Sequence, residues 1–454
     1  MTEFGRRKRG YPPTFPPKAQ PVAIRGSSGD RSILQLRPGD AVRPTAFMAV
    51  GEHSVRIRPV LSIFAASLIA MAPLHAFAQP EESVSVRDRP RPEFDPPGIP
   101  VGAFILHGSL DLGVATTDNV FAAETAEEED TIFTAGLRGR LQSNWSRHAL
   151  TFEAGAETVS YDEFSSEDYD TSYAGVAGRL DIGSSTNVNA RAYIAHDVES
   201  RRDPDAPAAG IPRAEFDRTE LAIGAQHRFN RLRVGATLSE LEHEYDGLQS
   251  FRDFNETRLT GRAELELTPR VGLLLEASTD ERDYDNTPAL SSEGQTYLVG
   301  ATLNLTDLMQ GEVAVGQFQR DYDFGGSSDG FAASADLEWY ITRLTTLSFH
   351  ARRNSEDVVG ATTALPYIDT RYGARVDHEL RRNIILTAGV EAGTRDYDTI
   401  VREDDFMYGD VGADFFVNRY VAIRARYEHA EVSSDVPTAE FDENRFSLGI
   451  SIRR

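Results

Sequence analysis

Residues 370–398 read TRYGARVDHELRRNIILTAGVEAGTRDYD, and apolar side chains recur in this stretch at alternate positions, with a break at His378. On either side of a short break at 381–383, the apolar positions are Tyr372, Ala374, Val376, Leu380, Ile384, Leu386, Ala388, Val390 and Ala392. A period of two is that of a β-strand, because successive side chains leave opposite faces of the pleat. Two such runs joined by a tight turn predict a β-hairpin.

The same alternation continues from Gly102 to the C-terminus and predicts about eighteen strands. Tight turns that carry Arg or Asn, such as 230–231 and 418–419, alternate with longer and mostly acidic loops, such as 117–130 and 354–366. Short turns on one side and long loops on the other are typical of outer-membrane barrels, whose short turns lie in the periplasm. We therefore predict that residues 102–454 form an all-β fold. The expected architecture is a transmembrane antiparallel up-and-down β-barrel with short periplasmic turns and longer acidic extracellular loops.

The strand face opposite the apolar rows is rich in ionised side chains. We expect the following residues to line the lumen: Arg138, Arg140, Glu153, Glu157, Arg179, Arg191, Arg228, Arg258, Arg262, Glu264, Glu276, Asp336, Glu338, Arg371, Arg375, Glu391, Arg424 and Arg426. A soluble core could not bury so many unpaired ions, so the charged face must meet water and the apolar face must meet lipid. A two-sheet sandwich, which would bury the apolar faces against each other, is the main alternative fold.

Aromatic residues near the predicted strand ends are expected in the girdles that mark the two membrane interfaces. They are Trp145, Trp339, Tyr340, Tyr372, Tyr408, Tyr420 and Tyr427. Ordinary strand packing is the alternative for each of them.

The first hundred residues follow no strand pattern. Residues 1–47 are rich in Arg, Pro and Gly, and they are either a disordered tail or lie upstream of a translation start at Met48. Residues 48–78 carry basic, apolar and small-residue zones in that order, which predicts a signal peptide cleaved between Ala78 and Gln79. Residues 79–101 are proline-rich and charged, and we interpret them as a periplasmic linker or plug.

Composition excludes several classes of function. The formal net charge of −24 argues against binding to a nucleic-acid backbone, and the lack of cysteine removes disulfides and thiolate metal sites. The sequence has no zinc-binding histidine pair, serine nucleophile elbow or phosphate loop, so we expect no cofactor, no metal site and no enzymatic activity. A hydrolase is a further alternative, with His243, beside Glu242 and Glu244, or His350 as its candidate catalytic residue.

The tetrapeptide Arg-Asp-Tyr-Asp recurs at 282–285, 320–323 and 395–398, with weaker echoes at 161–162 and 245–246. One interpretation is a reused hairpin template, with the tyrosine at the rim and the aspartates in solvent. The other is a ring of carboxylates and aromatic rings at the outer mouth, which would bind divalent cations between lipopolysaccharides or stack on sugars.

Several segments carry a family resemblance. Residues 87–96 read RDRPRPEFDP and are followed by GI at 98–99 and GAFIL at 102–106, then TDNVF at 117–121 and SNWSRH at 143–148. Together they resemble the β-barrel porin type 2 family of outer-membrane proteins of Gram-negative bacteria. The resemblance is specific over about residues 87–150 and continues as the hairpin pattern to the C-terminus. One departure is the C-terminus, Ile452-Arg453-Arg454, where many outer-membrane barrels end on an aromatic residue that the assembly machinery recognises.

The resemblance implies an outer-membrane barrel, and some related barrels accompany polysaccharide-export systems. With the strand pattern, it predicts a porin-like barrel that forms a polar conduit for hydrophilic solutes. The alternatives are a barrel component of a polysaccharide export system and an outer-membrane hydrolase. Expected partners are outer-membrane lipid and lipopolysaccharide, the barrel-assembly machinery and, for the export alternative, periplasmic export components; nucleic acid is not expected.

Overall fold

The computed structural model describes residues 84–204, 206–207, 210–305, 308–359, 364–398 and 400–454, together with Gly39–Asp40. The described residues belong to one compact unit. Apart from Gly39–Asp40, the predicted tail at 1–47 lies outside the described residues. So does the predicted signal peptide at 48–78, with its cleavage between Ala78 and Gln79.

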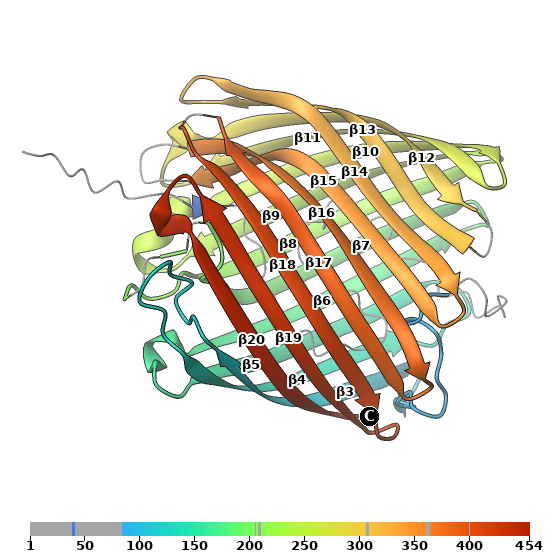
Figure 1. Ribbon diagram of the computed structural model, residues 1–454. Helices are drawn as coiled ribbons and strands as arrows, with labels where there is room; N and C mark the ends of the chain where they lie inside the picture. The colour runs from blue at the N-terminus through green and yellow to red at the C-terminus, as the bar shows by residue number, and fades with distance from the viewer. Residues whose placement is uncertain are drawn as a thin grey trace, which may run out of the picture. The chain divides into compact units, whose positions relative to one another are not determined.

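A closed antiparallel barrel of 18 long strands, β3 to β20, accounts for nearly all the described residues (Figure 1). The strands are β3 (Phe104–Thr117), β4 (Asp130–Ser143), β5 (Ala149–Tyr161), β6 (Tyr169–Ile182), β7 (Thr186–Val198), β8 (Glu215–Phe229), β9 (Leu232–Tyr245), β10 (Phe254–Thr268), β11 (Val271–Tyr284), β12 (Ser292–Asn304), β13 (Met309–Tyr322), β14 (Ser327–Thr342), β15 (Thr345–Val359), β16 (Ala364–Arg381), β17 (Ile384–Tyr397), β18 (Glu403–Phe416), β19 (Val421–Ser434) and β20 (Phe441–Arg453). Each strand pairs with its sequence neighbours, and β20 closes the barrel on β3 from Arg453↔Ser109 to Arg445↔Thr117. The predicted strand number and up-and-down order are confirmed, and one closed ladder excludes the two-sheet sandwich.

Smaller elements complete the chain. Strand β1 (Gly39–Asp40) pairs with the end of β15, and β2 (Ile99–Val101) pairs with the start of β3. Short 3₁₀ turns lie in the loops: η3 (Ser165–Glu167), η4 (Gly247–Arg252), η5 (Pro288–Leu290) and η7 (Pro437–Ala439). Among the described residues, no helix is long and apolar enough to cross a bilayer.

The apolar rows face outward. On β17, Leu386 and Val390 are 38% and 48% exposed, whereas their neighbours Ile385 and Thr387 are buried on the inner face. The same parity leaves Leu137 of β4 63% exposed, although it is a large apolar side chain. The barrel therefore exposes an apolar band, and each of its strands pairs with a neighbour on either side, as residence in lipid requires.

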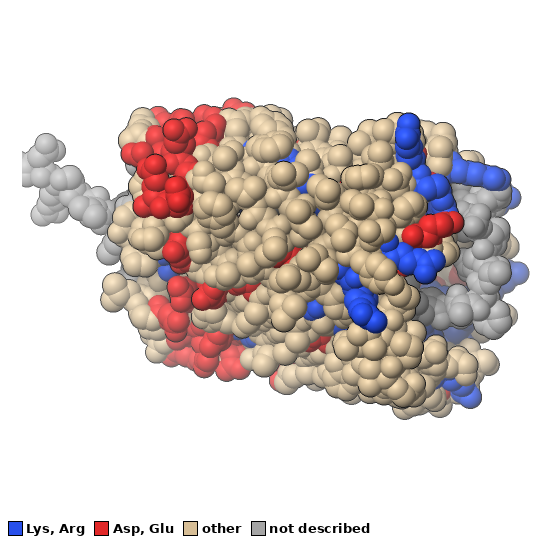
Figure 2. All heavy atoms as spheres, turned by 90° about the horizontal axis from the view of Figure 1, so that it is seen from below, with Lys and Arg blue, Asp and Glu red and all other residues tan. Residues whose placement is uncertain are grey.

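The two ends of the barrel differ in loop length and charge. Turns as short as 230–231 and 343–344 lie at the end where β3 begins and β20 ends, whereas the opposite end carries loops such as 118–129 and 199–214. Asn230 adopts φ 54°, a left-handed conformation that asparagine tolerates better than most residues and that a two-residue hairpin turn requires. Figure 2 shows acidic side chains gathered at the long-loop end, on the left, and Lys and Arg near the short-turn end, on the right.

Two expectations are corrected. The predicted long loop at 354–366 is mostly strand, because β15 runs to Val359 and β16 begins at Ala364. Polar residues hide the alternation there, since this part of β15 faces the lumen network rather than lipid. Tyr340 and Tyr408 do not join an outer girdle, because their hydroxyls contact Glu338 and Arg395 on the inner face. The other five proposed girdle residues are exposed: Trp145, Trp339, Tyr372, Tyr420 and Tyr427.

Candidate functional site: the charged inner face

The side chains predicted to line the lumen all lie on the strand face opposite the exposed apolar rows. Most of them pair across neighbouring strands instead of standing alone. Ion pairs join Arg138 to Glu157, Arg179 to Asp181, Arg191 to Glu220, Arg228 to Glu266, Arg258 to Asp280, Arg262 to Glu264 and Glu276, Arg371 to Glu391, Arg375 and Arg426 to Asp410, and Arg424 to Asp414. Glu338 instead accepts hydrogen bonds from Gln310 and Tyr340. No ion pair is found for Arg140 or Glu153 within the described part of the chain. Asp336 lies on the same inner face. That these groups line an open, water-filled channel remains a prediction.

Arg262 is the centre of the charge network at mid-height. Its guanidinium lies 2.5 Å from Glu312, 2.9 Å from Glu264 and 3.4 Å from Glu276, and its side chain is 10% exposed. The planar guanidinium presents five donors in a fixed fork, so one arginine can serve carboxylates on three strands. Because three carboxylates share this one cation, Arg262 offsets only part of the negative charge at the middle of the inner wall.

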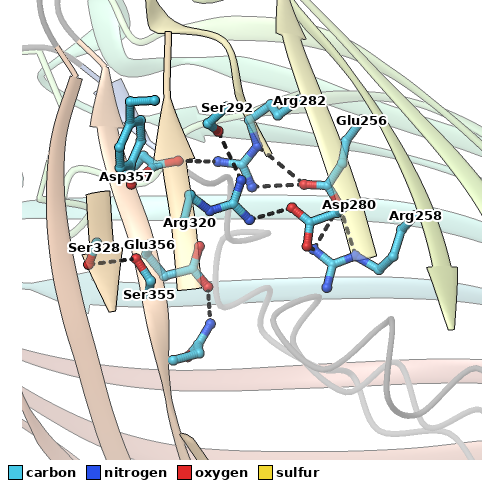
Figure 3. A network of polar contacts seen from close by, with 12 residues as sticks. Glu256, Arg258, Asp280, Arg282, Ser292, Arg320, Ser328, Ser355, Glu356 and Asp357 are labelled. Atoms are coloured by element: carbon cyan, nitrogen blue, oxygen red, sulfur yellow. Dashed lines mark hydrogen bonds and ion pairs between the residues drawn. The ribbon is translucent and has the colours of Figure 1, made fainter. Parts of the chain in front are cut away.

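A second network lies just below the long-loop end and joins β10, β11, β13 and β15 (Figure 3). Glu256 accepts hydrogen bonds from Arg258 at 2.9 Å and from Arg282 at 2.8 Å. Asp280 in turn contacts Arg258 at 3.5 Å and is hydrogen-bonded to Arg320. Buried ions are tolerated when pairing and hydrogen bonds offset their lost hydration, and this chain of alternating charges supplies both.

Two copies of the repeated Arg-Asp-Tyr-Asp motif contribute to this network through Arg282 and Arg320. In all three copies the arginine and the tyrosine point inward and are buried, and the three arginines are Arg282, Arg320 and Arg395. The aspartates after Arg282 and Arg320 are exposed on the other strand face. Sequence reasoning missed these arginines as inner-face residues, although strand parity within the motif contained the signal. No group of three or more potential metal-ligating side chains occurs among the described residues, so nothing here tests the cation-binding interpretation.

The proline-rich segment 84–98 lies against the inner face at the short-turn end. Arg87 is 2.7 Å from Asp377, and Arg89 and Arg91 are 3.4 Å and 3.1 Å from Glu379. Both carboxylates lie on β16 and were not predicted as site residues; parity alone places them inside. The pairing of basic residues with an acidic row explains why this charged segment takes an ordered conformation.

Apolar contacts and burial support the same docking. Val86 is fully buried against Ile385, Phe416 and Ala422 of the barrel wall. Burial lowers the pKa of the Arg91 guanidinium, and the nearby Glu379 carboxylate only partly opposes that effect. Arg91 therefore occupies a site where its hydrogen bonds must compensate for lost hydration.

The two candidate catalytic histidines lack a catalytic setting. His243 is buried with its ring stacked between Phe216 at 5.3 Å and Phe254 at 4.8 Å, and its Nδ1 has no hydrogen-bond partner among the described residues. Its neighbours Glu242 and Glu244 are exposed on the opposite strand face, so neither orients the imidazole. The Nε2 atom of His350 lies 2.9 Å from Glu391, which gives it a partner but no nucleophile. This geometry gives the hydrolase alternative no support.

Comparison with known proteins adds a family match. The model of the family described as "Putative beta-barrel porin 2" matches residues 91–454. A search of curated proteins finds no match.

Solved structures with a similar chain path include proteins of Pseudomonas aeruginosa and Acinetobacter baumannii. OpdL of Pseudomonas aeruginosa is 14% identical with a TM-score of 0.42, covering 78% of this chain and 99% of that one. OpdK of the same species is 12% identical with a TM-score of 0.44, covering 77% and 99%. OccAB2 of Acinetobacter baumannii is 12% identical with a TM-score of 0.45, covering 78% and 98%.

Proposed function

The chain belongs to the beta-barrel porin 2 family of outer-membrane barrels, and from this premise we propose that it is a porin-like conduit for hydrophilic solutes. The observation that carries the proposal is the division of each strand into an exposed apolar face and an ionised inner face. An 18-strand barrel encloses more space than its own side chains fill, so its charged interior holds water.

The charge pairing supports weak ion selectivity. Arginines and carboxylates alternate through the network around Glu256, and Arg262 offsets part of the charge of its three carboxylates, so both signs occur along the wall. Rings of one sign would select strongly against one ion, whereas interleaved signs set only a local field. We expect the conduit to pass small polar solutes of either sign.

The outer surface fits the partners expected from the sequence. The apolar band would contact the acyl chains of outer-membrane lipid, and the acidic long-loop end would lie among lipopolysaccharide head groups (Figure 2). The last strand, β20, turns Phe446, Leu448, Ile450 and Ile452 outward, and we propose that the assembly machinery recognises this apolar row.

Planar-bilayer recording of the refolded protein tests the conduit. We expect stepwise conductance increases in potassium chloride and a similar permeability for K⁺ and Cl⁻. Swelling of proteoliposomes in sugars of increasing size would measure the largest solute that passes through the conduit. Folded protein, identified by heat-modifiable migration on gels, that gives neither steps nor swelling would contradict the proposal. Loss of surface polysaccharide in a deletion strain would favour the export alternative instead.

A further inference from the structure

The upper part of β15 leaves the barrel wall. The described residues of β14 and β15 pair only from Thr342↔Thr345 up to Ala333↔Arg353. Beyond that point β14 continues to Ser327 along β13, whereas β15 continues to Val359 along β16, with the two residues of β1 at its end. Residues Asn354 to Val359 are therefore released from β14, their neighbour in the barrel wall.

Side-chain contacts hold this released segment against the inner wall (Figure 3). Oδ2 of Asp357 accepts a hydrogen bond from Nη1 of Arg282 at 2.8 Å, and Oδ1 accepts one from the hydroxyl of Tyr322. Ser355 lies beside Ser328 of β14, with 3.4 Å between their hydroxyl oxygens. Asp357 is 2% exposed, so its carboxylate is enclosed by these contacts.

The two donors belong to the wall, and each has contacts there besides Asp357. Arg282 on β11 is fixed by Glu256, which accepts from its Nε at 3.2 Å and its Nη2 at 2.8 Å. Tyr322 ends β13 and packs with Phe254, Tyr284 and Leu290. One guanidinium donor and one hydroxyl donor, each aimed at a different oxygen, make a preformed receptor for a carboxylate.

We propose that Arg282 and Tyr322 form a binding site for the carboxylate of a transported solute, and that Asp357 occupies it as a displaceable internal ligand. The inference rests on the proposed conduit function and specifies its solute class. Replacing the Asp357 carboxylate by that of a solute preserves both charge-assisted hydrogen bonds. Movement of the released part of β15 breaks no backbone hydrogen bonds with β14, because the two strands do not pair there. A tethered ligand acts at an effective concentration on the order of millimolar, so displacement needs carboxylate in that range.

Benzoate is a suitable probe, with benzamide as its uncharged control. By calorimetry on the folded full-length protein, we expect Asp357→Ala to bind benzoate about tenfold or more tightly than the wild type, because the competing side chain is gone. Adding Tyr322→Phe to Asp357→Ala should weaken that binding. In bilayers, millimolar benzoate should raise wild-type conductance but lower that of Asp357→Ala, whose empty site now holds the probe. Benzamide should do neither.

A second variant tests the movement without removing the carboxylate. The chain has no cysteine, so Ser328→Cys with Ser355→Cys can form one disulfide that holds β15 to β14. We expect benzoate binding to disappear on oxidation and to return on reduction. This variant decides the question if Asp357→Ala fails to fold.

The outcomes separate the two proposals. Equal benzoate affinity in the wild type and Asp357→Ala, or in the oxidised and reduced double-cysteine protein, overturns the carboxylate site even if the barrel conducts. Selective benzoate binding by Asp357→Ala in a barrel that shows no conductance supports the site but removes the conduit.

Discussion

Removing the Arg91 side chain should release segment 84–98 from the barrel. The guanidinium is fully buried and donates to the carbonyl oxygen of Val86 at 2.5 Å, to that of Arg89 at 3.1 Å and to Glu379 at 3.1 Å. The variant Arg91→Ala deletes all three contacts at once. It leaves Glu379, which is 3% exposed, with Arg89 at 3.4 Å and Arg382 at 3.8 Å as its remaining cations.

The free-energy cost of Arg91→Ala can be estimated from the loss of its buried ion pair with Glu379. Loss of one partner of a buried ion pair costs about 3 to 5 kcal/mol, and the remaining arginines favour the lower end of that range. Since about 1.4 kcal/mol corresponds to a factor of ten, the detached population should rise about 100-fold. A larger detached population should also widen the short-turn end of the lumen and raise single-channel conductance.

Maleimide labelling of a cysteine at position 85 measures the detachment. Ser85 is 7% exposed and the chain has no other cysteine, so labelling reports on this site alone. Glu93→Ala is the matched control, because that carboxylate is 64% exposed and its pair with Arg382 at 3.7 Å contributes at most about 1 kcal/mol. If Ser85→Cys with Arg91→Ala labels no faster than Ser85→Cys with Glu93→Ala, the segment does not depend on this buried pair.

Further predictions test the inner face, the outer face and a turn. Arg262→Ala leaves three carboxylates without their shared cation, so the reversal potential in a KCl gradient should shift toward cation selectivity. Arg262→Lys keeps the positive charge and should shift the potential less. An unchanged potential in Arg262→Ala would place this residue outside the conduction path. Leu275→Arg puts a charge on the lipid face of β11 and should destabilise folding into vesicles by about 2 to 4 kcal/mol, whereas Ser278→Arg on the inner face of the same strand should be tolerated; equal losses in urea titrations would contradict the assignment of faces. Asn230→Val should lower the free energy of unfolding by about 1 to 2 kcal/mol because φ at this position is 54°, whereas Asn230→Gly should lower it little. Equal unfolding of the two variants in the urea titration would contradict the predicted strain in the turn.

Strand parity alone determined a large part of this protein. Side chains two apart share a face whatever the strand pairs with, so the outward row through Leu386 and Val390 and the inward arginines such as Arg262 could be read directly. The alternation of short turns with long loops fixed the up-and-down order and an even strand number. These are local properties of the chain, so the sequence alone was enough to predict them.

Which charges meet was decided only when the barrel closed. Arg282 and Asp357 are separated by 75 positions and lie on strands that are not neighbours, so no local pattern pairs them. Likewise Arg91 finds Glu379 at a separation of 288, from a segment whose composition predicts only a linker or plug. The alternation rule itself did not predict side-chain directions where β15 leaves β14. A strand has an inner and an outer face only while it lies in the barrel wall. Periodicity specifies the direction in which a side chain points, whereas register, closure and docking set what it reaches.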